Sequence, residues 1–258
     1  MSRDAVVQAR GITVRFDGVV ANDGVDLDVG AGAIVGLIGP NGAGKTTFID
    51  ALSGFVPASG TLMLGDRWIE RLAPHARARA GLARTWQSLE LFPDLTVAEN
   101  LQIAARRFSL RGALADLVRP SRRAEEAAVA RALELVGIAA LADRRPGELS
   151  LGHEKLVGVA RALAAAPRAL LLDEPAAGLP RSETDQLGRH LRAVADSGVA
   201  VLLVDHDMGL VLDVCDDLYV LDFGRVIAHG RPAEVRRDPA VVAAYLGGEH
   251  ARAAEAAR

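Results

Sequence analysis

A glycine-rich segment constrains the fold of this chain more than any other feature. Residues 39–47 read Gly-Pro-Asn-Gly-Ala-Gly-Lys-Thr-Thr, which fits the pattern G-x-x-x-x-G-K-[ST] in full. The apolar run Ala33–Ile38 precedes this segment, and Phe48, Ile49 and Leu52 follow it at helical spacing. A buried strand, a glycine-rich turn and a helix in this order predict a phosphate-binding loop.

The residue types of the loop suit phosphate chemistry. Glycines let the backbone turn its N–H groups inward around phosphates, and the N-terminus of the following helix adds partial positive charge. Lys45 is expected to reach the β- and γ-phosphates of a nucleotide, and the Thr46 hydroxyl to hold Mg²⁺. A glycine-rich turn with a chance lysine is the alternative. We assign nucleotide binding to the loop residues Gly39, Asn41, Gly42, Ala43, Gly44, Lys45, Thr46 and Thr47.

Two adjacent acids follow another apolar run. Leu170–Leu172 lead directly into Asp173 and Glu174. Asp173, at the exit of a buried strand, is expected to reach Mg²⁺ directly or through water. Glu174 could polarise a water molecule in line with the γ-phosphate. A strand followed by a solvated acidic turn is the alternative, and the phosphate loop in the same chain disfavours it. The two segments together predict an ATPase that uses ATP and Mg²⁺.

The order of the expected elements indicates an α/β fold. The runs Val6–Phe16 and Val25–Val29 alternate in polarity, as strands do. Residues 88–160 are rich in Ala and Arg and contain the capping box Thr96–Glu99, which predicts helices. Strands and helices then alternate, which favours parallel pairing. We predict a P-loop NTPase core with a mostly parallel sheet, an N-terminal antiparallel β subdomain and an inserted α-helical subdomain.

The expected boundaries describe one domain over residues 5–247. Within it, 5–87 and 161–247 form the core with the β subdomain, and 88–160 form the helical subdomain. Residues 248–258 are rich in Ala, Glu and Arg and are expected to be a flexible tail. Pro180 is expected at the first position of a helix, and the runs on either side of Gly224 are expected to form a closing hairpin.

The net charge, the single cysteine and the length of the apolar runs indicate which partners and which cellular compartment to expect. The 258 residues carry a formal net charge of -3, which argues against a nucleic-acid partner bound through its phosphates. The single cysteine, Cys215, lies in an apolar run, so we expect a buried structural thiol and a reducing cytoplasm. No apolar run approaches the roughly 20 residues of a membrane span, and no signal-peptide pattern begins the chain. If the protein acts at a membrane, other chains are expected to supply the spanning helices.

With these residues in view, the chain resembles the ATP-binding cassette (ABC) ATPases over residues 5–247. The resemblance implies that Phe16 stacks on adenine, that Gln87 contacts Mg²⁺ and the attacking water, and that His206 is the family's switch histidine. The alternatives are a core phenylalanine, a polar loop residue and an ordinary turn histidine. On this basis catalysis is assigned to Lys45, Gln87, Glu174 and His206, and metal binding to Thr46, Gln87 and Asp173.

A fourth segment, Leu149–His153, resembles the family's signature motif Leu-Ser-Gly-Gly-Gln. Ser150 is expected to cap a helix, so that its hydroxyl, the Gly152 backbone and the helix N-terminus form an anion site. In the family this site faces the γ-phosphate held by a second subunit. The resemblance therefore implies a head-to-tail pair of ATPases with ATP at the interface, the partner being a copy of this chain or a paralogue. Leu151 and His153 depart from the family's glycine and glutamine.

The closer resemblance is to the ATP-binding subunits of branched-chain amino acid importers. It is carried by the segments Ala83–Gln87, Leu91–Leu101, Pro175–Leu179 and Asp205–Met208. Trp86 and Pro180 depart from that branch's usual Phe and Asn. The resemblance implies permease partners, a solute-binding protein that acts indirectly, and a peripheral place on the cytoplasmic face of the cell membrane.

Several readings stay open at this stage. The loop at Leu91, Phe92 and Pro93 is expected to touch the permease, or else to cap the helical subdomain's own core. A non-transport ABC ATPase and a nucleotide-gated interaction module without hydrolysis are the alternatives for the whole chain. The sequence names neither the transported solute nor the second ATPase, and the direction of transport follows from the resemblance alone.

Overall fold

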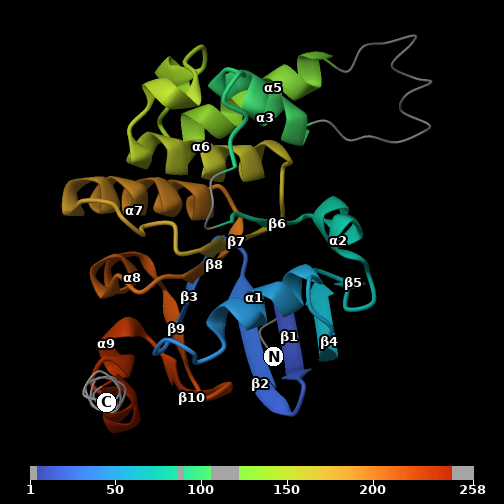
Figure 1. The fold of residues 1–258 in the computed structure, drawn as a ribbon, viewed down its shortest axis with the longest axis vertical. Coiled ribbons are helices and arrows are strands. Elements are labelled where there is room, and N and C mark those ends of the chain that lie inside the picture. Colours follow the sequence, from blue (N-terminus) through green and yellow to red (C-terminus); the bar gives the residue numbers. More distant parts are fainter. Residues whose placement is uncertain (1–4, 87–89, 106–121, 246–258) are drawn as a thin grey trace.

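The main sheet has six strands in the order β10-β9-β3-β8-β7-β6. The computed structural model describes residues 5–86, 90–105 and 122–245 (Figure 1). All neighbouring strands in this sheet pair in parallel except β9 and β10, which form the expected antiparallel hairpin. The strands are β3 (Ile34–Ile38), β6 (Leu82–Arg84), β7 (Ala169–Asp173), β8 (Ala200–Val204), β9 (Asp217–Asp222) and β10 (Arg225–Gly230).

A second sheet is antiparallel, in the order β2-β1-β4-β5. Its strands are β1 (Ala5–Phe16), β2 (Val19–Gly30), β4 (Ser59–Leu64) and β5 (Arg67–Trp68). Burial alternates along β1, because one face of this sheet packs on the core and the other faces solvent. In contrast, every residue of β3, β7 and β8 is buried, since helices or the second sheet cover both faces. The predicted antiparallel β subdomain and parallel core are confirmed.

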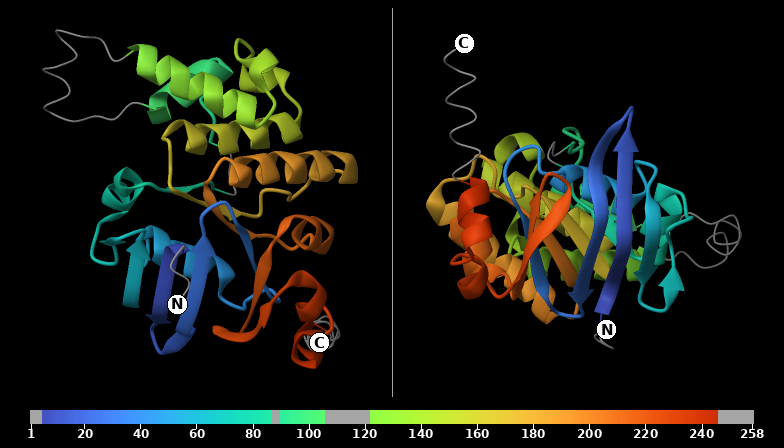
Figure 2. Two further views of the ribbon diagram at one scale, coloured as in Figure 1. Left: turned by 180° about the vertical axis from the view of Figure 1, so that it is seen from behind. Right: turned by 90° about the horizontal axis from the view of Figure 1, so that it is seen from below.

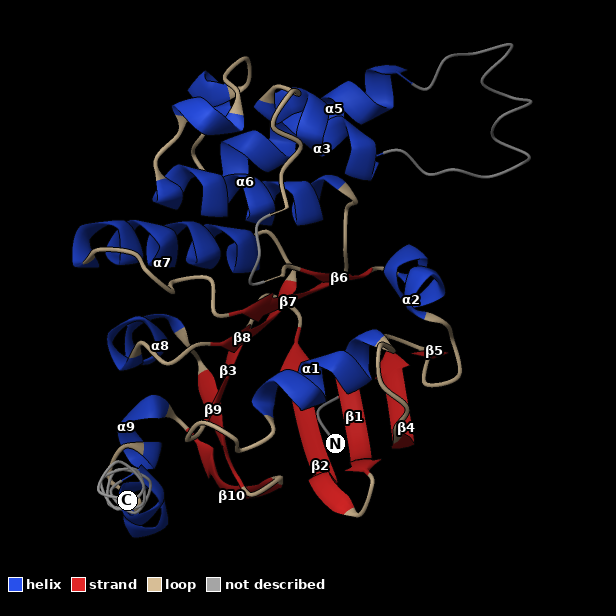
Figure 3. Ribbon diagram, viewed as in Figure 1, coloured by secondary structure: helices blue, strands red, loops and turns tan. Residues whose placement is uncertain are grey.

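Helices cover the main sheet and gather at one end of the molecule (Figure 3). They are α1 (Lys45–Ser53), α2 (Pro74–Ala80), α3 (Val97–Ala105), α5 (Arg122–Leu135), α6 (Leu151–Ala164), α7 (Arg181–Asp196), α8 (Met208–Val214) and α9 (Pro232–Val235), with short 3₁₀ turns at Ala139–Leu141 and Pro146–Glu148. Helices α3, α5 and α6 pack together above α7, and the views of Figure 2 show the same grouping.

Alternate residues of the parallel strands supply two separate cores. On one face, Ile38, Leu172 and Leu203 pack with residues of α6, α7 and α8, and this core continues into α3 and α5. On the other face, Leu37 and Leu171 pack with α1 and with the antiparallel sheet. Helix α1 is therefore held between the two sheets, and the loop before it is fixed from both sides.

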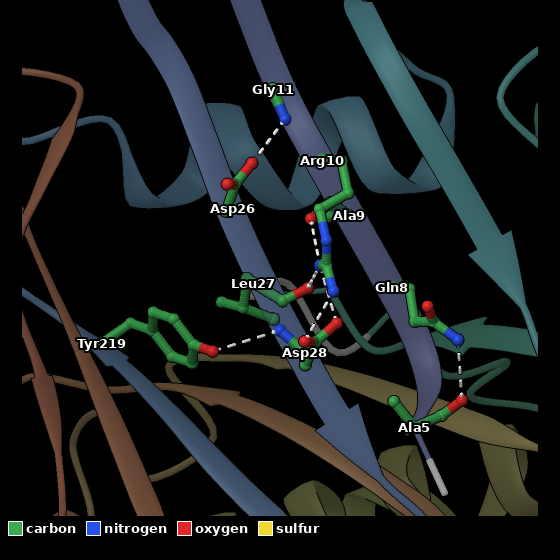
Figure 4. Close-up of polar contacts among 9 residues, drawn as sticks. All are labelled: Ala5, Gln8, Ala9, Arg10, Gly11, Asp26, Leu27, Asp28 and Tyr219. Carbon is green, nitrogen blue, oxygen red and sulfur yellow. Dashed lines mark hydrogen bonds and ion pairs between the residues drawn. The ribbon is translucent and has the colours of Figure 1, made fainter. Parts of the chain in front are cut away.

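Polar contacts tie β1 to β2 within the antiparallel sheet and link β2 to β9 of the main sheet (Figure 4). The Asp28 backbone N–H donates to the Tyr219 hydroxyl at 3.3 Å, which links β2 to β9. Arg10 on β1 donates to the Asp28 carboxylate at 2.7 Å, and the Gly11 N–H donates to Asp26 at 2.7 Å. Tyr219 is buried, whereas Arg10 and Asp28 are half-buried and Asp26 is exposed. We therefore expect the charged contacts to orient the strands more than to stabilise them.

Local signals read from the sequence set several element ends. The capping box is present: the Thr96 N–H donates to Glu99 at 2.8 Å, and the Glu99 N–H donates to the Thr96 hydroxyl at 3.2 Å. The position predicted for Pro180 was wrong by one residue. Its ψ of 157° is extended and its carbonyl accepts the first helical hydrogen bonds, so it is the cap before α7.

The single cysteine lies inside the main core. Cys215 follows α8, is buried and contacts the side of β3 at Gly36. Burial raises the pKa of its thiol to about 12. The predicted buried structural thiol is confirmed. Among the described helices, none is long and apolar enough to cross a membrane.

Candidate active site

The phosphate loop connects β3 to α1 through left-handed glycines. Gly44 has φ of 101° and a Cβ there would lie 2.8 Å from the Asn22 amide nitrogen. A Cβ at Gly39 would collide with the Leu221 carbonyl. The Gly224 N–H also donates to the Ala43 carbonyl at 2.9 Å, which ties the β9–β10 turn to the loop. Only glycine permits this close backbone path, which explains the spacing seen in the sequence.

Lys45 is the first residue of α1 and is almost fully buried. Its ammonium group donates to the carbonyls of Gly39 and Pro40 at 2.8 and 2.9 Å. Burial lowers the pKa of Lys45, while the charges of Glu174 and Asp173 act in the opposite direction. Carbonyl oxygens do not neutralise an ammonium ion, so the loop keeps its positive charge at the helix N-terminus. This arrangement favours an anion such as a phosphate.

Asp173 lies at the carboxyl end of β7 and is buried. Its Oδ2 accepts a hydrogen bond from Arg84 Nη2 at 3.1 Å, whereas its Oδ1 has no hydrogen-bond partner among the described residues. Burial raises the pKa of Asp173, and the Arg84 guanidinium opposes that rise. A buried carboxylate oxygen without a donor is costly unless something else contacts it. A hard cation fits this oxygen, since Mg²⁺ prefers carboxylate and hydroxyl ligands, and Thr46 is exposed on the first turn of α1.

Glu174 and His206 lie together at the ends of adjacent strands. The His206 Nδ1 is 3.9 Å from Glu174 Oε1. Glu174 has φ of 49°, in the left-handed region that non-glycine residues rarely adopt. The fully buried Asp205 accepts from the Ala176 and Asp207 N–H groups, both at 2.9 Å, and so fixes the two strand exits relative to each other. Backbone strain stored beside a phosphate loop is typical of a catalytic position.

A depression of about 480 Å³ joins the phosphate loop to Glu174, a size that suits a small-molecule ligand, whereas Asp173 and His206 do not line it. It is lined by Val19, Val20, Ala21, Asn41, Gly42, Gly44, Lys45, Thr46, Thr47, Glu174, Phe223 and Gly224. The structure thus brings the phosphate loop and Glu174 to one cavity, as the sequence predicted. The assigned chemical roles of these residues stay predictions.

Two aromatic residues lie beside or near this depression. Phe16, at the end of β1, is 45% exposed, so the alternative of a core phenylalanine is wrong. Its stacking on adenine stays a prediction, because Phe16 does not line the depression. Phe223 does line it and is 87% exposed in the β9–β10 turn. The sequence analysis missed Phe223, although a large apolar residue before the Gly224 turn could have been noticed.

The signature segment lies on a different part of the molecule. Ser150 caps α6 and its hydroxyl accepts from the His153 N–H at 3.3 Å, which confirms the expected cap. None of the signature residues lines the depression at Lys45, and α6 and α1 pack on opposite faces of the main sheet (Figure 1). One chain therefore does not bring its own Ser150 to its own phosphate loop. Gln87 lies outside the described residues.

A carboxylate of this chain lies at the signature segment. Glu183, in the first turn of α7, has its Oε1 3.5 Å from the Ser150 hydroxyl, which donates to it. A Cβ at Gly152 would collide with Glu183 Oε2, so the glycine makes room for this acid. The His153 Nδ1 lies 3.3 Å from the same hydroxyl. The sequence analysis did not single out Glu183.

Comparison with known proteins decides the family. The model of the ABC transporter family matches residues 22–177. The chain belongs to the ABC transporter family. It is an ATPase subunit of that family, as the phosphate loop and the two adjacent acids in the sequence predicted. A second model, of the branched-chain amino acid ATP-binding cassette transporter, matches residues 225–251 of this ABC ATPase.

Relatives and solved structures that match nearly the whole chain support the same family. The high-affinity branched-chain amino acid transport ATP-binding proteins BraF of Pseudomonas aeruginosa and LivG of Escherichia coli are 40% and 39% identical. The alignments cover 96% and 94% of this chain and 99% and 98% of those relatives. The lipopolysaccharide export system ATP-binding protein LptB of Escherichia coli is 37% identical over 94% of this chain and 98% of its own. An ATP-binding cassette of an ABC transporter in its ADP conformation superposes with a TM-score of 0.83 at 32% identity, covering 94% of this chain and 99% of that one.

Proposed function

We propose that this ABC ATPase drives an importer for branched-chain or related amino acids. The observation that carries the import assignment is the match of residues 225–251 to the branched-chain amino acid transporter model, together with the full-length likeness to BraF and LivG. The similarity to an export protein, LptB, shows why the cassette core alone would not decide the direction. The proposal keeps one ATPase domain over residues 5–247, with residues 88–160 as its helical subdomain.

The depression at the phosphate loop supports a division of roles among its residues. Lys45 is placed to exchange its carbonyl partners for the β- and γ-phosphates of ATP. The loop N–H groups and Thr47 surround the same phosphates. In this proposal Phe16 contacts the nucleoside, with Phe223, which lines the depression, as a second apolar side chain. This arrangement binds a triphosphate by charge at one end and by apolar surface at the other.

Hydrolysis requires a base and a metal near the terminal phosphate. Mg²⁺, held by Thr46, Asp173 and Gln87, would neutralise charge that develops on the phosphate oxygens. Glu174 accepts a proton from the attacking water, because its carboxylate opens into the depression that contains Lys45. His206 lies close enough to Glu174 to orient that carboxylate or the water. The unpartnered Asp173 Oδ1 is the observation that favours the metal at this point.

A second ABC ATPase subunit completes the site in this proposal. Because Ser150 and Gly152 lie away from the chain's own phosphate loop, we propose that they meet a γ-phosphate on another subunit, which has to displace the Glu183 carboxylate. Two subunits arranged head to tail then bury two ATP molecules, and hydrolysis releases the contact. The partner is either a copy of this chain or a paralogue.

An apolar groove supports a permease partner. It has a volume of about 580 Å³ and runs between α2, β6 and α6, past Phe55 and Trp86. Leu91 packs against the main core, as the capping alternative expected, whereas Phe92 is 48% exposed. A cytoplasmic helix of the permease would fit such a groove, which supports our proposal that the ATPase lies peripherally on the cytoplasmic face of the cell membrane.

Transport by a reconstituted complex tests the function. The chain would be purified with a permease and a solute-binding protein of the branched-chain amino acid class from the same organism and placed in vesicles that contain ATP and Mg²⁺. We expect labelled leucine, isoleucine or valine to cross the membrane, with ATP hydrolysis stimulated by the loaded binding protein. The Glu174→Gln variant is the matched control, because it should bind ATP without driving transport. Stimulation by a lipopolysaccharide donor, with none by amino acids, would overturn the import assignment.

A further inference from the structure

Arg84 makes an unusually complete set of contacts for a residue at the end of a short edge strand. Its side chain is 8% exposed, and it forms ion pairs with Asp50 on α1 and Asp173 on β7. The two carboxylates are bound by different nitrogens, Nη1 and Nη2. A planar guanidinium can bind two acids at once in fixed directions, which a lysine ammonium cannot do in the same way. Arg84 therefore joins α1 to the strand end at the proposed metal site.

The same guanidinium lies against two aromatic rings. Its Cζ is 4.4 Å from the centre of the Trp86 ring and 5.9 Å from that of Phe55. The two rings contact each other edge to face, with their centres 4.8 Å apart. Both rings and Arg84 line the apolar groove described above, and so does Asp173. One side chain thus touches the carboxylate of the nucleotide site and the aromatic wall of the groove.

The charges explain why Arg84 is needed when no nucleotide is bound. Asp173 is buried, and a buried carboxylate without a cation is strongly unfavourable. Among the described residues, Arg84 is the only cation paired with it. The free oxygen, Oδ1, faces no donor, so a second cation can approach Asp173 there. A second cation on the Asp173 carboxylate weakens the attraction between Asp173 and Arg84. The ion pair between Asp50 and Arg84 does not involve that carboxylate and so remains.

We propose that Arg84 is a positioning residue that serves as the counter-cation of Asp173 in the nucleotide-free protein. It gives way to Mg²⁺ when nucleotide binds and shifts on the face of Trp86 as it does. This inference rests on the proposed function, since it takes Asp173 as a metal ligand. Its consequence is that the aromatic wall of the groove senses whether the metal site is filled.

Trp86 fluorescence reports this shift directly. The chain contains two tryptophans, and the other, Trp68, is 56% exposed on β5, so Trp68→Phe leaves Trp86 as the single tryptophan, which can be excited selectively over the two tyrosines. In that background, adding Mg²⁺ to the protein with bound ADP should change the Trp86 emission, and EDTA should reverse the change. Arg84→Met should abolish the response while ADP still binds. An emission response that survives in Arg84→Met would overturn the proposal.

Thermal unfolding separates a counter-cation from a merely structural residue. Arg84→Met should lower the Tm most without ligand and least with Mg²⁺ and ADP, because the metal then supplies the missing charge. By linkage, Mg²⁺ should bind the Arg84→Met protein with ADP about fivefold more tightly than the wild type, the scale of one solvent-screened charge pair. An equal loss of Tm with and without Mg²⁺ would mean a packing role only, against the proposal.

Conservative variants keep the test decisive if Arg84→Met folds poorly. Arg84→Lys retains the charge but loses the flat face, so it should keep the wild-type dependence of Tm on Mg²⁺ and lose the Trp86 response. Asp50→Asn is the matched control: it removes the outer carboxylate and should leave the Mg²⁺ affinity within about twofold of the wild type. Arg84→Lys that behaves as the wild type in both assays would overturn the assigned stacking.

The variant Asp173→Asn separates a failure of the metal site at Asp173 from a failure of the role proposed for Arg84. If Asp173→Asn binds Mg²⁺ and ADP normally, the metal assignment in the proposed function fails, and this inference fails with it. If Asp173→Asn loses the Mg²⁺ response while Arg84→Met keeps it, the metal assignment stands and the inference about Arg84 alone is overturned.

Discussion

The phosphate loop and the signature segment each present a helix N-terminus, yet their electrostatics are opposite. At the start of α1 the cap is Gly44, without a side chain, and Lys45 places a positive charge beside the loop. At the start of α6 the cap is Ser150, whose hydroxyl already contacts His153 and the carboxylate of Glu183. The phosphate loop can therefore accept an anion directly, whereas the signature segment already contacts an anion of the same chain, the Glu183 carboxylate.

This difference teaches how one chain can carry two halves of a phosphate site without joining them. A cationic loop binds phosphate as soon as nucleotide is present. An anion site that contacts its own carboxylate requires an incoming phosphate to compete with that carboxylate. Binding at the loop is therefore expected to be a property of the single chain, and binding at the signature segment a property of the pair.

Removing the charge of the loop should have the largest effect. Lys45→Ala deletes the ammonium group opposite the β- and γ-phosphates, and charged hydrogen bonds of this kind contribute about 1.5–3 kcal/mol each. We expect ATP affinity to fall about 100-fold or more in equilibrium binding at physiological salt. Lys45→Arg, which keeps a charge on a longer fork, is the control and should lose less. Unchanged affinity in Lys45→Ala would show that the loop binds phosphate through its backbone alone.

Glu174→Gln should separate binding from hydrolysis. The amide keeps the size of the side chain but accepts no proton, so the ATPase rate should fall by about 10²-fold, on the scale of general-base catalysis. ATP binding should persist, and a nucleotide-bound dimer should accumulate in size-exclusion chromatography. A normal hydrolysis rate would move the role of base to another group, with His206 the next candidate at 3.9 Å.

Neutralising the anion at the signature segment should strengthen the pair. Glu183→Gln keeps a partner for the Ser150 hydroxyl and removes the charge that opposes an incoming phosphate. In a Glu174→Gln background we expect ATP-dependent dimerisation to tighten about fivefold, as one screened charge contact would give. Sedimentation at several protein concentrations measures this. A weaker dimer would mean that Glu183 supports the signature geometry and does not compete with phosphate.

His153→Gln should have the smallest effect. Histidine and glutamine side chains both donate and accept hydrogen bonds, so the contact with the Ser150 hydroxyl can be kept. We expect the ATPase rate to stay within about threefold, or 0.65 kcal/mol of barrier. The variant should be compared with His153→Ala, which removes the contact. A larger loss in His153→Gln than in His153→Ala would contradict the equivalence of the two side chains.

The elements that local sequence controls were predictable, and long-range contacts were not. Local patterns predicted the phosphate loop, the capping box at Thr96 and the buried run before Asp173, because each of these features depends on residues that are close in the chain. The contacts of Glu183 with Ser150 and of Arg84 with Asp173 join residues 33 and 89 positions apart, so no local pattern encodes them. Phe223 is locally visible as a large apolar residue before a turn, but its place at the nucleotide depression depends on the long-range pairing of β9 with β3.

The buried thiol of Cys215 is a built-in chemical probe of how often the core opens. Cys215 is buried, and burial also raises the pKa of its thiol to about 12, so a disulfide reagent meets almost no accessible thiolate while the fold is closed. Labelling in native buffer therefore requires a transient opening between α8 and β3, the strand that leads into the phosphate loop. The rate at which a chromogenic disulfide reagent modifies Cys215 measures the free energy of that opening when reclosing is faster than reaction. Nucleotide that binds only the closed form should slow the labelling in proportion to its saturation.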